Sequence, residues 1–206
     1  MASINYNTEI TQKSKGLGHV LSKFLRTRGK FVGSDGYATL PDLHKHSSNR
    51  FTIETLLFVI ENDEKNRFQY KFENEILCVR ARQGHRNHVG GVLDDWVEIL
   101  QGSIEIAVHG TSREALSMIL QPGNGLSKMD REWIHFAPRI DNESGFRKNS
   151  KVAIYLNIQK CLDDGIKLYL TGNNVILSQG QGTTGMITSN YFLRIVDLET
   201  DDEIHF

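Results

Sequence analysis

The sequence has little that would commit the chain to a membrane, a disulfide framework or a metal site. Only two of its 206 residues are cysteines, Cys78 and Cys161, and each lies in an apolar, strand-like run. Two such thiols favour buried, reduced side chains in a cytosolic or nuclear protein that binds no metal. No apolar run is long enough to span a bilayer, and residues 1–16 lack the apolar core of a signal peptide.

Common catalytic motifs are missing as well. The sequence has no Ser-His-Asp order, no Walker loop and no Cys/His metal spacing. The glycine-rich residues 180–185 lack the following helix and lysine of a phosphate-cradling loop. The composition, 39% hydrophobic and 24% charged, is that of an ordinary globular protein, and the length fits one large domain or two small lobes.

What the chain does have is an uneven distribution of charge. The formal net charge is −1, yet residues 1–50 carry eight Lys or Arg against three Asp or Glu. The most basic stretch is CVRARQGHRNHV (78–89), and no acid lies between Glu75 and Asp94. Such a stretch is either a solvated basic patch or a pocket for an anion, and the basic front of the chain favours a polyanionic partner.

Hydrophobic spacing predicts two helices and a hairpin in the first half of the chain. The predicted elements are helices over residues 14–28 and 52–60 and strands over residues 62–72 and 75–81. The turn between the strands is expected at Glu73-Asn74, and Lys65 and Arg67 then fall in the first strand. Two helices followed by a hairpin make a winged-helix-like pattern.

The second half has the pattern of a β-rich lobe with little helix. Its predicted helix covers residues 113–120, and its predicted strands cover residues 133–138, 152–158, 166–170, 174–178 and 191–198. The change of character falls near residues 95–103. We therefore predict an α+β fold with an N-terminal winged-helix-like lobe over residues 1–100 and a β-rich lobe over residues 101–206.

The stretch VHGTS places polar groups after an apolar strand of the second half. His109, Gly110 and Thr111 form either an ordinary strand end or a site for a nucleotide ribose. In the second case Gly110 would permit close approach of the backbone, since it has no Cβ.

Two further stretches of this half carry basic groups. Arg131 is expected in the loop before the strand that holds His135, and a structural role is the commoner fate of such a histidine. Arg147 follows Gly145 at the entrance of the most apolar strand. A guanidinium there is either a surface group or a fork for a phosphate.

Arginines also recur at the ends of elements in the first half. Arg26 closes the first predicted helix, and Arg67 lies in the first predicted strand. Neither motif has an acid in its core, and unpaired guanidinium groups that are brought together repel one another. We therefore interpret these arginines as phosphate ligands rather than as contributors to stability.

Nine stretches, taken in order, resemble the RNA 2′-phosphotransferase (tRNA 2′-phosphotransferase) family. They are LSKFLR (21–26), DGYATL (35–40), ENDEKNRF (61–68), VRARQGH (79–85), HGTS (109–112), GLSKMDREWIHFA (125–137), SGFR (144–147), DGIKLYLTGNNVILSQG (164–180) and NYF (190–192). The resemblance is collinear over roughly residues 14–197. It implies a winged-helix RNA-binding lobe followed by an ADP-ribosyltransferase-like lobe that binds NAD.

The activity implied by the resemblance is removal of an internal RNA 2′-phosphate, such as tRNA splicing leaves at a splice junction. NAD would be consumed as the co-substrate, by way of an ADP-ribosylated RNA intermediate. The products would be ADP-ribose 1″,2″-cyclic phosphate, nicotinamide and RNA with a 2′-hydroxyl. The expected partners are therefore NAD and an RNA with an internal 2′-phosphate, and a monomer is expected.

The resemblance also assigns roles by position. Residues implied to act on the 2′-phosphate are Arg26, Arg67 and Arg147, the last two matching Lys-x-Arg-Phe and Ser-Gly-Met-Arg motifs. Residues implied on the NAD side are His109, Gly110, Thr111, Arg131 and His135. Residues implied to line the RNA side of the cleft are Lys65, Arg82, Gln83 and His85.

The sequence departs from the family pattern in two places. The first helix of the family ends in Leu-Arg-His, and that place is filled either by Arg26-Thr27 or, in an ungapped register, by Ser22-Lys23. We favour the first register because it keeps the cation. Trp133 stands where the family tends to have the first histidine of a His-x-His pair, and an indole stacks well but does no acid–base work.

These departures leave two alternatives open. One is a diverged ADP-ribosyltransferase that acts on another phosphate end or on a protein. The other is a non-catalytic module that binds RNA or a nucleotide.

Overall fold

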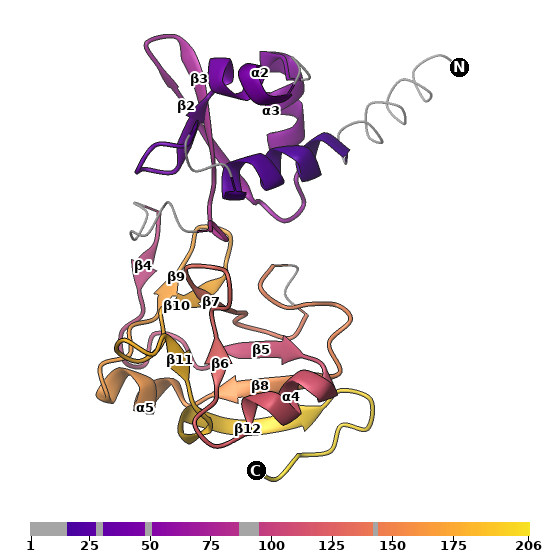
Figure 1. The fold of residues 1–206 in the computed structure, drawn as a ribbon, viewed down its shortest axis with the longest axis vertical. Coiled ribbons are helices and arrows are strands. Elements are labelled where there is room, and N and C mark those ends of the chain that lie inside the picture. The colour runs from indigo at the N-terminus through magenta and orange to yellow at the C-terminus, as the bar shows by residue number, and fades with distance from the viewer. Residues whose placement is uncertain (1–15, 28–30, 48–50, 87–94, 142–143) are drawn as a thin grey trace. The chain divides into compact units, whose positions relative to one another are not determined.

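The computed structural model describes residues 16–27, 31–47, 51–86, 95–141 and 144–206, and the chain forms two compact units (Figure 1). The first unit comprises residues 1–93 and the second residues 94–206. The sequence pattern placed the boundary at residue 100. The division falls earlier because β4 (Val97–Glu98) pairs with β9 (Tyr169–Leu170) of the second unit.

The first unit contains three helices and a small antiparallel sheet within its described residues. Its elements are a helix over residues 16–27, β1 (Tyr37–Thr39), α2 (Leu40–Ser47), α3 (Ile53–Glu61), β2 (Phe68–Glu73) and β3 (Ile76–Ala81). The sheet order is β1-β3-β2. The two predicted helices and the hairpin are present, whereas β1 and α2 escaped prediction because three and eight residues are too few to show a clear period.

The apolar residues that predicted these helices form the core of the first unit. Leu21 and Leu25 of the first helix and Leu56 of α3 are fully buried. Burial of such a side chain stabilises the fold by about 1.5–3 kcal/mol. A capping box begins α3, where the Thr52 and Thr55 hydroxyls each accept the backbone N–H of the other residue, at 3.2 and 2.8 Å.

The hairpin turn lies one residue later than predicted. Asn74 and Glu75 both have positive φ, at 49° and 65°, as a tight two-residue hairpin requires, and Glu73 pairs with Ile76 across it. The first hairpin strand also starts later than predicted. Lys65 and Arg67 therefore lie in the loop before β2 and not in the strand.

A turn at Asp63 explains the late start of β2. The Asn66 N–H donates to the Asp63 carbonyl at 2.7 Å, and Asn66 has a φ of 44°. The Asp63 carboxylate accepts the backbone N–H of Arg67. Carboxylates of aspartate commonly close such turns, which compete with an extended chain.

The second unit consists of three small antiparallel sheets with short helices, so the chain has the predicted α+β class. A three-stranded sheet contains β12 (Phe192–Asp197), β8 (Val152–Leu156) and β5 (Val108–Thr111), which lie side by side in Figure 1. A four-stranded sheet contains β4, β9, β10 (Ile176–Ser178) and β7 (Ile134–Phe136). The remaining elements are β6 (Leu126–Ser127), β11 (Met186–Ile187), α4 (Arg113–Ile119), α5 (Ile158–Asp163) and η2 (Ser189–Tyr191).

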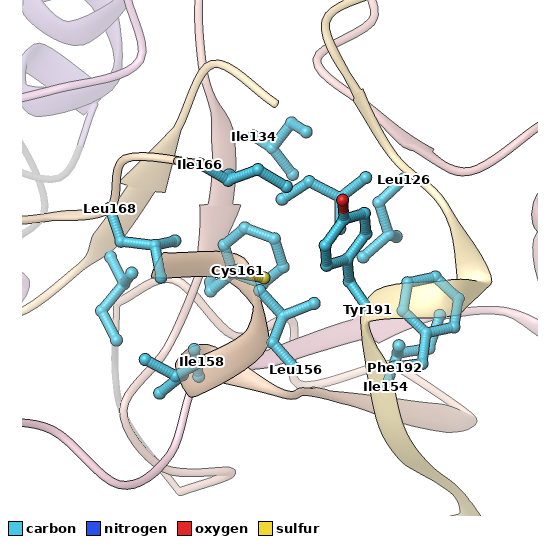
Figure 2. Close-up of a cluster of buried hydrophobic side chains, with 14 of the residues drawn as sticks. Leu126, Ile134, Ile154, Leu156, Ile158, Cys161, Ile166, Leu168, Tyr191 and Phe192 are labelled. Atoms are coloured by element: carbon cyan, nitrogen blue, oxygen red, sulfur yellow. The ribbon is translucent and has the colours of Figure 1, made fainter. Parts of the chain in front are cut away.

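A cluster of buried apolar side chains from these sheets and from α5 forms the main core of the second unit, as Figure 2 shows. The predicted strand over residues 152–158 ends at Leu156, because the Asn157 side chain accepts the Lys160 N–H at 3.0 Å and caps α5. Cys161 therefore lies in a helix rather than in a strand.

The prediction of buried, unbridged cysteines is confirmed. Both thiols are free and buried. Burial raises the pKa of the Cys161 thiol to about 12 and also raises the pKa of Cys78. Among the described residues, no helix combines the length and apolarity that crossing a membrane would require.

Candidate functional site

Strand β5 carries the His109-Gly110-Thr111 motif of the second unit. It pairs with β8, with Gly110 opposite Ala153. A Cβ placed on Gly110 would lie 2.3 Å from Ser150 Oγ and 2.9 Å from Phe146 Cε2. The absence of a Cβ on Gly110 therefore makes room for the side chains of Phe146 and Ser150, which lie on either side of Arg147 in the sequence. The space that the sequence predicted for a ligand thus serves the packing of the protein as well.

The hydrogen bonds of His109 fix its tautomer. Its Nδ1 lies 2.9 Å from the His135 carbonyl oxygen, which can only accept, so Nδ1 carries the proton and Nε2 is left as the acceptor. Burial is the main cause that lowers the pKa of His109, and the charges of Arg147 and Arg131 lower it further. The His135 carbonyl opposes this shift. The ring is therefore neutral at physiological pH.

The two arginines that act on His109 are exposed. Arg131 lies in the bend before β7, as predicted, and Arg147 lies in a tight loop after Gly145. Gly145 has a φ of 86°, and a Cβ on it would lie 2.8 Å from the Phe136 carbonyl oxygen, so only glycine fits there. The Ser150 N–H donates to the Arg147 carbonyl at 3.0 Å and closes the loop.

His135 and Trp133 belong to the interior of the second unit. His135 lies on β7 and its Nδ1 is 2.9 Å from the Trp133 carbonyl oxygen. The Trp133 ring packs edge-on against Trp96 and Tyr169, with ring centroids 5.1 and 5.6 Å apart. Because Trp133 is only 5% exposed, its ring stabilises the fold, and its buried Nε1 finds no hydrogen-bond acceptor among the described residues.

In the first unit, Arg67 is paired with an acid. Its Nε donates to Asp63 Oδ1 at 2.9 Å, and its Nη2 donates to the same carboxylate. The interpretation that these arginine motifs lack an acid is therefore wrong for Arg67. The acid lies four residues earlier, where the turn before β2 brings its carboxylate back to the guanidinium.

Arg26 and the stretch after β3 are brought together. The Arg86 N–H donates to the Arg26 carbonyl at 2.9 Å, and a Cβ on Gly84 would lie 3.1 Å from Arg26 Nε. The Arg82 N–H donates to the Arg67 carbonyl at 2.9 Å. Arg26 and Arg67 thus both adjoin the basic stretch that the sequence singled out.

The rest of the basic stretch divides between the interior and the surface. Gln83 and His85 are buried, and a Cβ on Gly36 would lie 3.7 Å from His85 Nε2. Lys65, which lies outside this stretch in the loop before β2, is exposed. Residues 87–89 of the stretch lie outside the described part of the chain.

Arg80, the first basic residue of the stretch, has a structural role. It is 1% exposed, and its Nε and Nη2 donate to Gln69 Oε1 at 3.0 and 2.6 Å. Its Nη1 donates to the Asp35 carbonyl, and its guanidinium lies 4.7 Å from the Tyr37 ring centroid. These contacts tie the loop before β1 to the sheet.

The two residues proposed for the end of the first helix differ in environment. The Thr27 hydroxyl donates to the Lys23 carbonyl at 2.7 Å, so it bonds back onto its own helix. In the other register, Ser22 is buried. Arg26, between them, is the residue that adjoins Gly84.

Three contributors to these sites were missed from the sequence. Asp63 could have been found from its spacing of four residues before Arg67. Phe146 and Ser150 gave no signal, because only the folded loop places them against Gly110. Over the described ranges, no group of three or more His, Cys, Asp or Glu side chains is arranged to hold a metal ion.

Comparison with known proteins gives one family for this chain. The family described as "RNA 2'-phosphotransferase, Tpt1 / KptA family" matches residues 8–180. A protein of Schizosaccharomyces pombe named putative tRNA 2'-phosphotransferase is 32% identical over 205 residues, which are 97% of this chain and 54% of that protein. The tRNA 2'-phosphotransferase 1 of Danio rerio is 31% identical over 98% of this chain and 93% of its own length. A probable RNA 2'-phosphotransferase of Flavobacterium johnsoniae is 29% identical over 80% of this chain.

Proposed function

The chain belongs to the RNA 2′-phosphotransferase, Tpt1 / KptA family, and from that premise we propose that it removes an internal 2′-phosphate from RNA with consumption of NAD. The expected products are RNA with a 2′-hydroxyl, ADP-ribose 1″,2″-cyclic phosphate and nicotinamide. The names of the Schizosaccharomyces pombe and Danio rerio relatives refer to tRNA, so tRNA with a 2′-phosphate at a splice junction is the proposed natural substrate.

The first unit is proposed to bind the RNA. Its order of elements, with a helix, a strand, two helices and a hairpin, supports the proposal of a winged-helix-like RNA-binding lobe. Arg26, Arg67 and the stretch around Arg82 to His85 adjoin one another in this unit. Cations that are grouped in this way favour a phosphodiester or phosphate ligand.

The second unit is proposed to bind NAD in the manner of an ADP-ribosyltransferase. The donor set fits that ligand, because the neutral His109 offers Nε2 as an acceptor for a ribose hydroxyl. The neighbouring Arg131 and Arg147 supply positive charge for phosphate oxygens. The buried Ser150 hydroxyl, which has no hydrogen-bond partner among the described residues, lies beside Gly110 and adds a further polar group.

In the proposed reaction NAD supplies an electrophilic sugar carbon with nicotinamide as its leaving group, and the protein supplies fixed charge. Arg26 and Arg67 of the first unit would hold the 2′-phosphate oxygens in a productive orientation, and the family pattern assigns Arg147 to the same phosphate. His109 would orient the ribose by accepting from its hydroxyl, and its lowered pKa would keep it from competing for the phosphate as a cation. The observation that carries this proposal beyond the family match is the hydrogen bond of His109 Nδ1 to the His135 carbonyl, which leaves Nε2 as an acceptor. This acceptor lies on the strand where the Ser150 hydroxyl, unpartnered among the described residues, lies against Gly110.

The test is to incubate the full chain with NAD and a short RNA that carries one internal 2′-phosphate, and to resolve all products by mass. Formation of the 2′-hydroxyl RNA together with nicotinamide and the cyclic phosphate supports the proposal. A persistent ADP-ribosylated RNA would instead indicate a transferase that stops after its first step. Binding without any release of nicotinamide would indicate a non-catalytic module.

A further inference from the structure

The carboxylate of Asp63 is a buried charged group that contacts the proposed phosphate ligand Arg67. Its side chain is 4% exposed, whereas that of Arg67 is 31% exposed. The carboxylate accepts the backbone N–H of Arg67 and also receives Nε and Nη2 of the same residue. A single acid thus holds both the backbone and the side chain of Arg67.

Asp63 binds one edge of the Arg67 guanidinium and leaves another edge available. A guanidinium has five N–H donors in a planar fork. Asp63 occupies the edge formed by Nε and Nη2, and Nη1 has no hydrogen-bond partner among the described residues. The edge formed by Nη1 and Nη2 therefore remains for two parallel hydrogen bonds to one phosphate.

Apolar and backbone contacts limit the remaining freedom of this side chain. The Arg67 guanidinium lies 5.5 Å from the centroid of the Phe68 ring. A Cβ on Gly18 would lie 3.8 Å from Arg67 Nη2, so the first helix passes close to this group. The backbone of Arg67 is held as well, since its carbonyl accepts the Arg82 N–H at 2.9 Å.

We propose that Asp63 is a positioning residue that presents the Nη1–Nη2 edge of Arg67 to the 2′-phosphate of the RNA. This inference rests on the proposed function, because that function identifies the anion. An acid beside an anion site weakens the attraction of the site for the anion. Asp63 is therefore useful at this site only if the orientation of the Arg67 guanidinium matters more than the net charge of the site. Orientation does matter more for a ligand that must be held in line for a reaction.

The experiment measures how strongly the full chain distinguishes a phosphorylated RNA from its unphosphorylated counterpart. Two short single-stranded RNAs are used, identical except for one internal 2′-phosphate, and the ratio of their dissociation constants is determined by fluorescence anisotropy. A variant that is partly unfolded binds both RNAs less, and the ratio stays unchanged. Loss of positioning lowers the ratio itself, so a merely structural role would not produce this result.

We expect Asp63→Asn to lower this ratio about tenfold, the effect of losing one well-placed hydrogen bond to a charged group. Arg67→Ala is expected to lower it at least as much. The double variant should match Arg67→Ala, because Asp63 acts only through Arg67. An unchanged ratio in Asp63→Asn, with a lowered ratio in Arg67→Ala, would overturn the inference and leave the phosphate clamp in place.

Asp197→Asn is the matched control. Asp197 receives Nε and Nη2 of Arg113 at 2.8 and 2.9 Å, the same two donor atoms that Asp63 receives from Arg67. This pair lies in the second unit and is not part of the proposed phosphate site, so its loss should leave the ratio unchanged. An equal fall of the ratio in Asp197→Asn would overturn the inference.

Arg67→Lys tests the idea even if Asp63→Asn does not fold. Lysine keeps the charge but has no planar fork for Asp63 to orient. The ratio should fall nearly as far as in Arg67→Ala, and a retained ratio would show that charge alone suffices. If Arg67→Ala itself leaves the ratio unchanged, the phosphate clamp of the proposed function fails as well.

Discussion

Arg80 lies in β3 of the first unit and Arg147 in the loop before β8 of the second unit, and their surroundings are opposite. Arg80 is almost completely buried, and its donors are taken by Gln69 and by the Asp35 carbonyl. Arg147 is exposed, and its charge acts on His109. A basic residue in a motif therefore indicates a ligand-binding site only when its N–H donors are not already bound within the protein. Buried arginines such as Arg80 fail this condition.

Arg67 lies between these two extremes. It is partly exposed, one edge of its guanidinium is satisfied by Asp63, and the other edge faces no acceptor among the described residues. The guanidinium donors of Arg80 bind groups inside the protein and stabilise the fold. In Arg67 and Arg147, donors remain that can bind a ligand.

The largest effect is expected from the arginines whose donors can bind a ligand. Arg67→Ala and Arg147→Ala should each lower turnover of 2′-phosphorylated RNA by about a hundredfold to a thousandfold, the usual effect of removing one preorganised donor from a reacting anion. Thermal unfolding of Arg147→Ala should stay close to that of the parent, whereas Arg67→Ala should unfold at a lower temperature because the buried Asp63 carboxylate loses its guanidinium partner. Arg113→Ala, which removes a surface ion pair of the second unit, is the control. Parental turnover in both Arg67→Ala and Arg147→Ala would refute the proposed phosphate clamp.

Arg80→Met should instead act on stability. It removes the donors that satisfy Gln69 Oε1 and the Asp35 carbonyl inside the first unit, at a cost of about 2–3 kcal/mol in the free energy of unfolding. The matched control is Arg194→Met, since Arg194 also lies over a tyrosine ring but is exposed, and its loss should cost no more than about 1 kcal/mol. Denaturant unfolding of both variants measures the difference, and equal costs would contradict it.

Gly110→Ala should cost about 1–3 kcal/mol of stability, because the new methyl group meets Phe146 and Ser150. NAD binding, measured by calorimetry, should weaken in the same variant, because the methyl group pushes β5 away from the loop that carries Phe146 and Ser150. Gly16→Ala is the control, since a Cβ there meets no atom within 4 Å among the described residues outside its own helix backbone, and alanine favours a helix. A Gly110→Ala variant as stable as the parent would mean that the loop yields without strain.

The smallest effect is expected on a titration. Arg147→Gln should raise the pKa of His109 toward its ordinary value of 6.5, because one of the charges that lower it is removed. The pKa should remain below that value, since burial is the main cause of the shift. NMR titration of the ring measures it, with Arg139→Gln as a control, because Arg139 pairs with Asp141. An unchanged pKa would mean that Arg147 exerts no field on the ring.

The same shift has a consequence for stability. Because the folded state lowers the pKa of His109, the unfolded chain binds more protons below pH 6.5, and stability falls as the pH drops through that value. Arg147→Gln should make this fall shallower. A stability curve that is flat below pH 6.5 would contradict the assigned direction.

The periodic parts of the fold could be predicted, and the parts held by single contacts could not. The first and third helices, the hairpin and most strands of the second unit follow from hydrophobic spacing. The late start of β2 could not be predicted, because the Asp63 turn overrides the strand-like composition of the residues around it. The end of β8 was missed in the same way, since Asn157 caps a helix within an apolar run.

The candidate site was predictable in its residue types but not in their environments. Arg131, His135 and Arg147 lie where the sequence placed them, in a bend, in a strand and after a glycine turn. Their roles toward NAD and RNA stay predictions. The buried position of Trp133 depends on long-range packing, which motif spacing does not encode, whereas the acid partner of Arg67 lies at a spacing of four residues that the sequence already contains.

The contact of Phe146 and Ser150 with Gly110 has a mechanical consequence. These two residues lie on either side of Arg147 in the sequence, and their side chains contact β5, the strand that carries His109. With no spare space between them, loop and strand must shift together. We therefore expect Arg147 to stay near His109 even though its side chain is exposed to solvent.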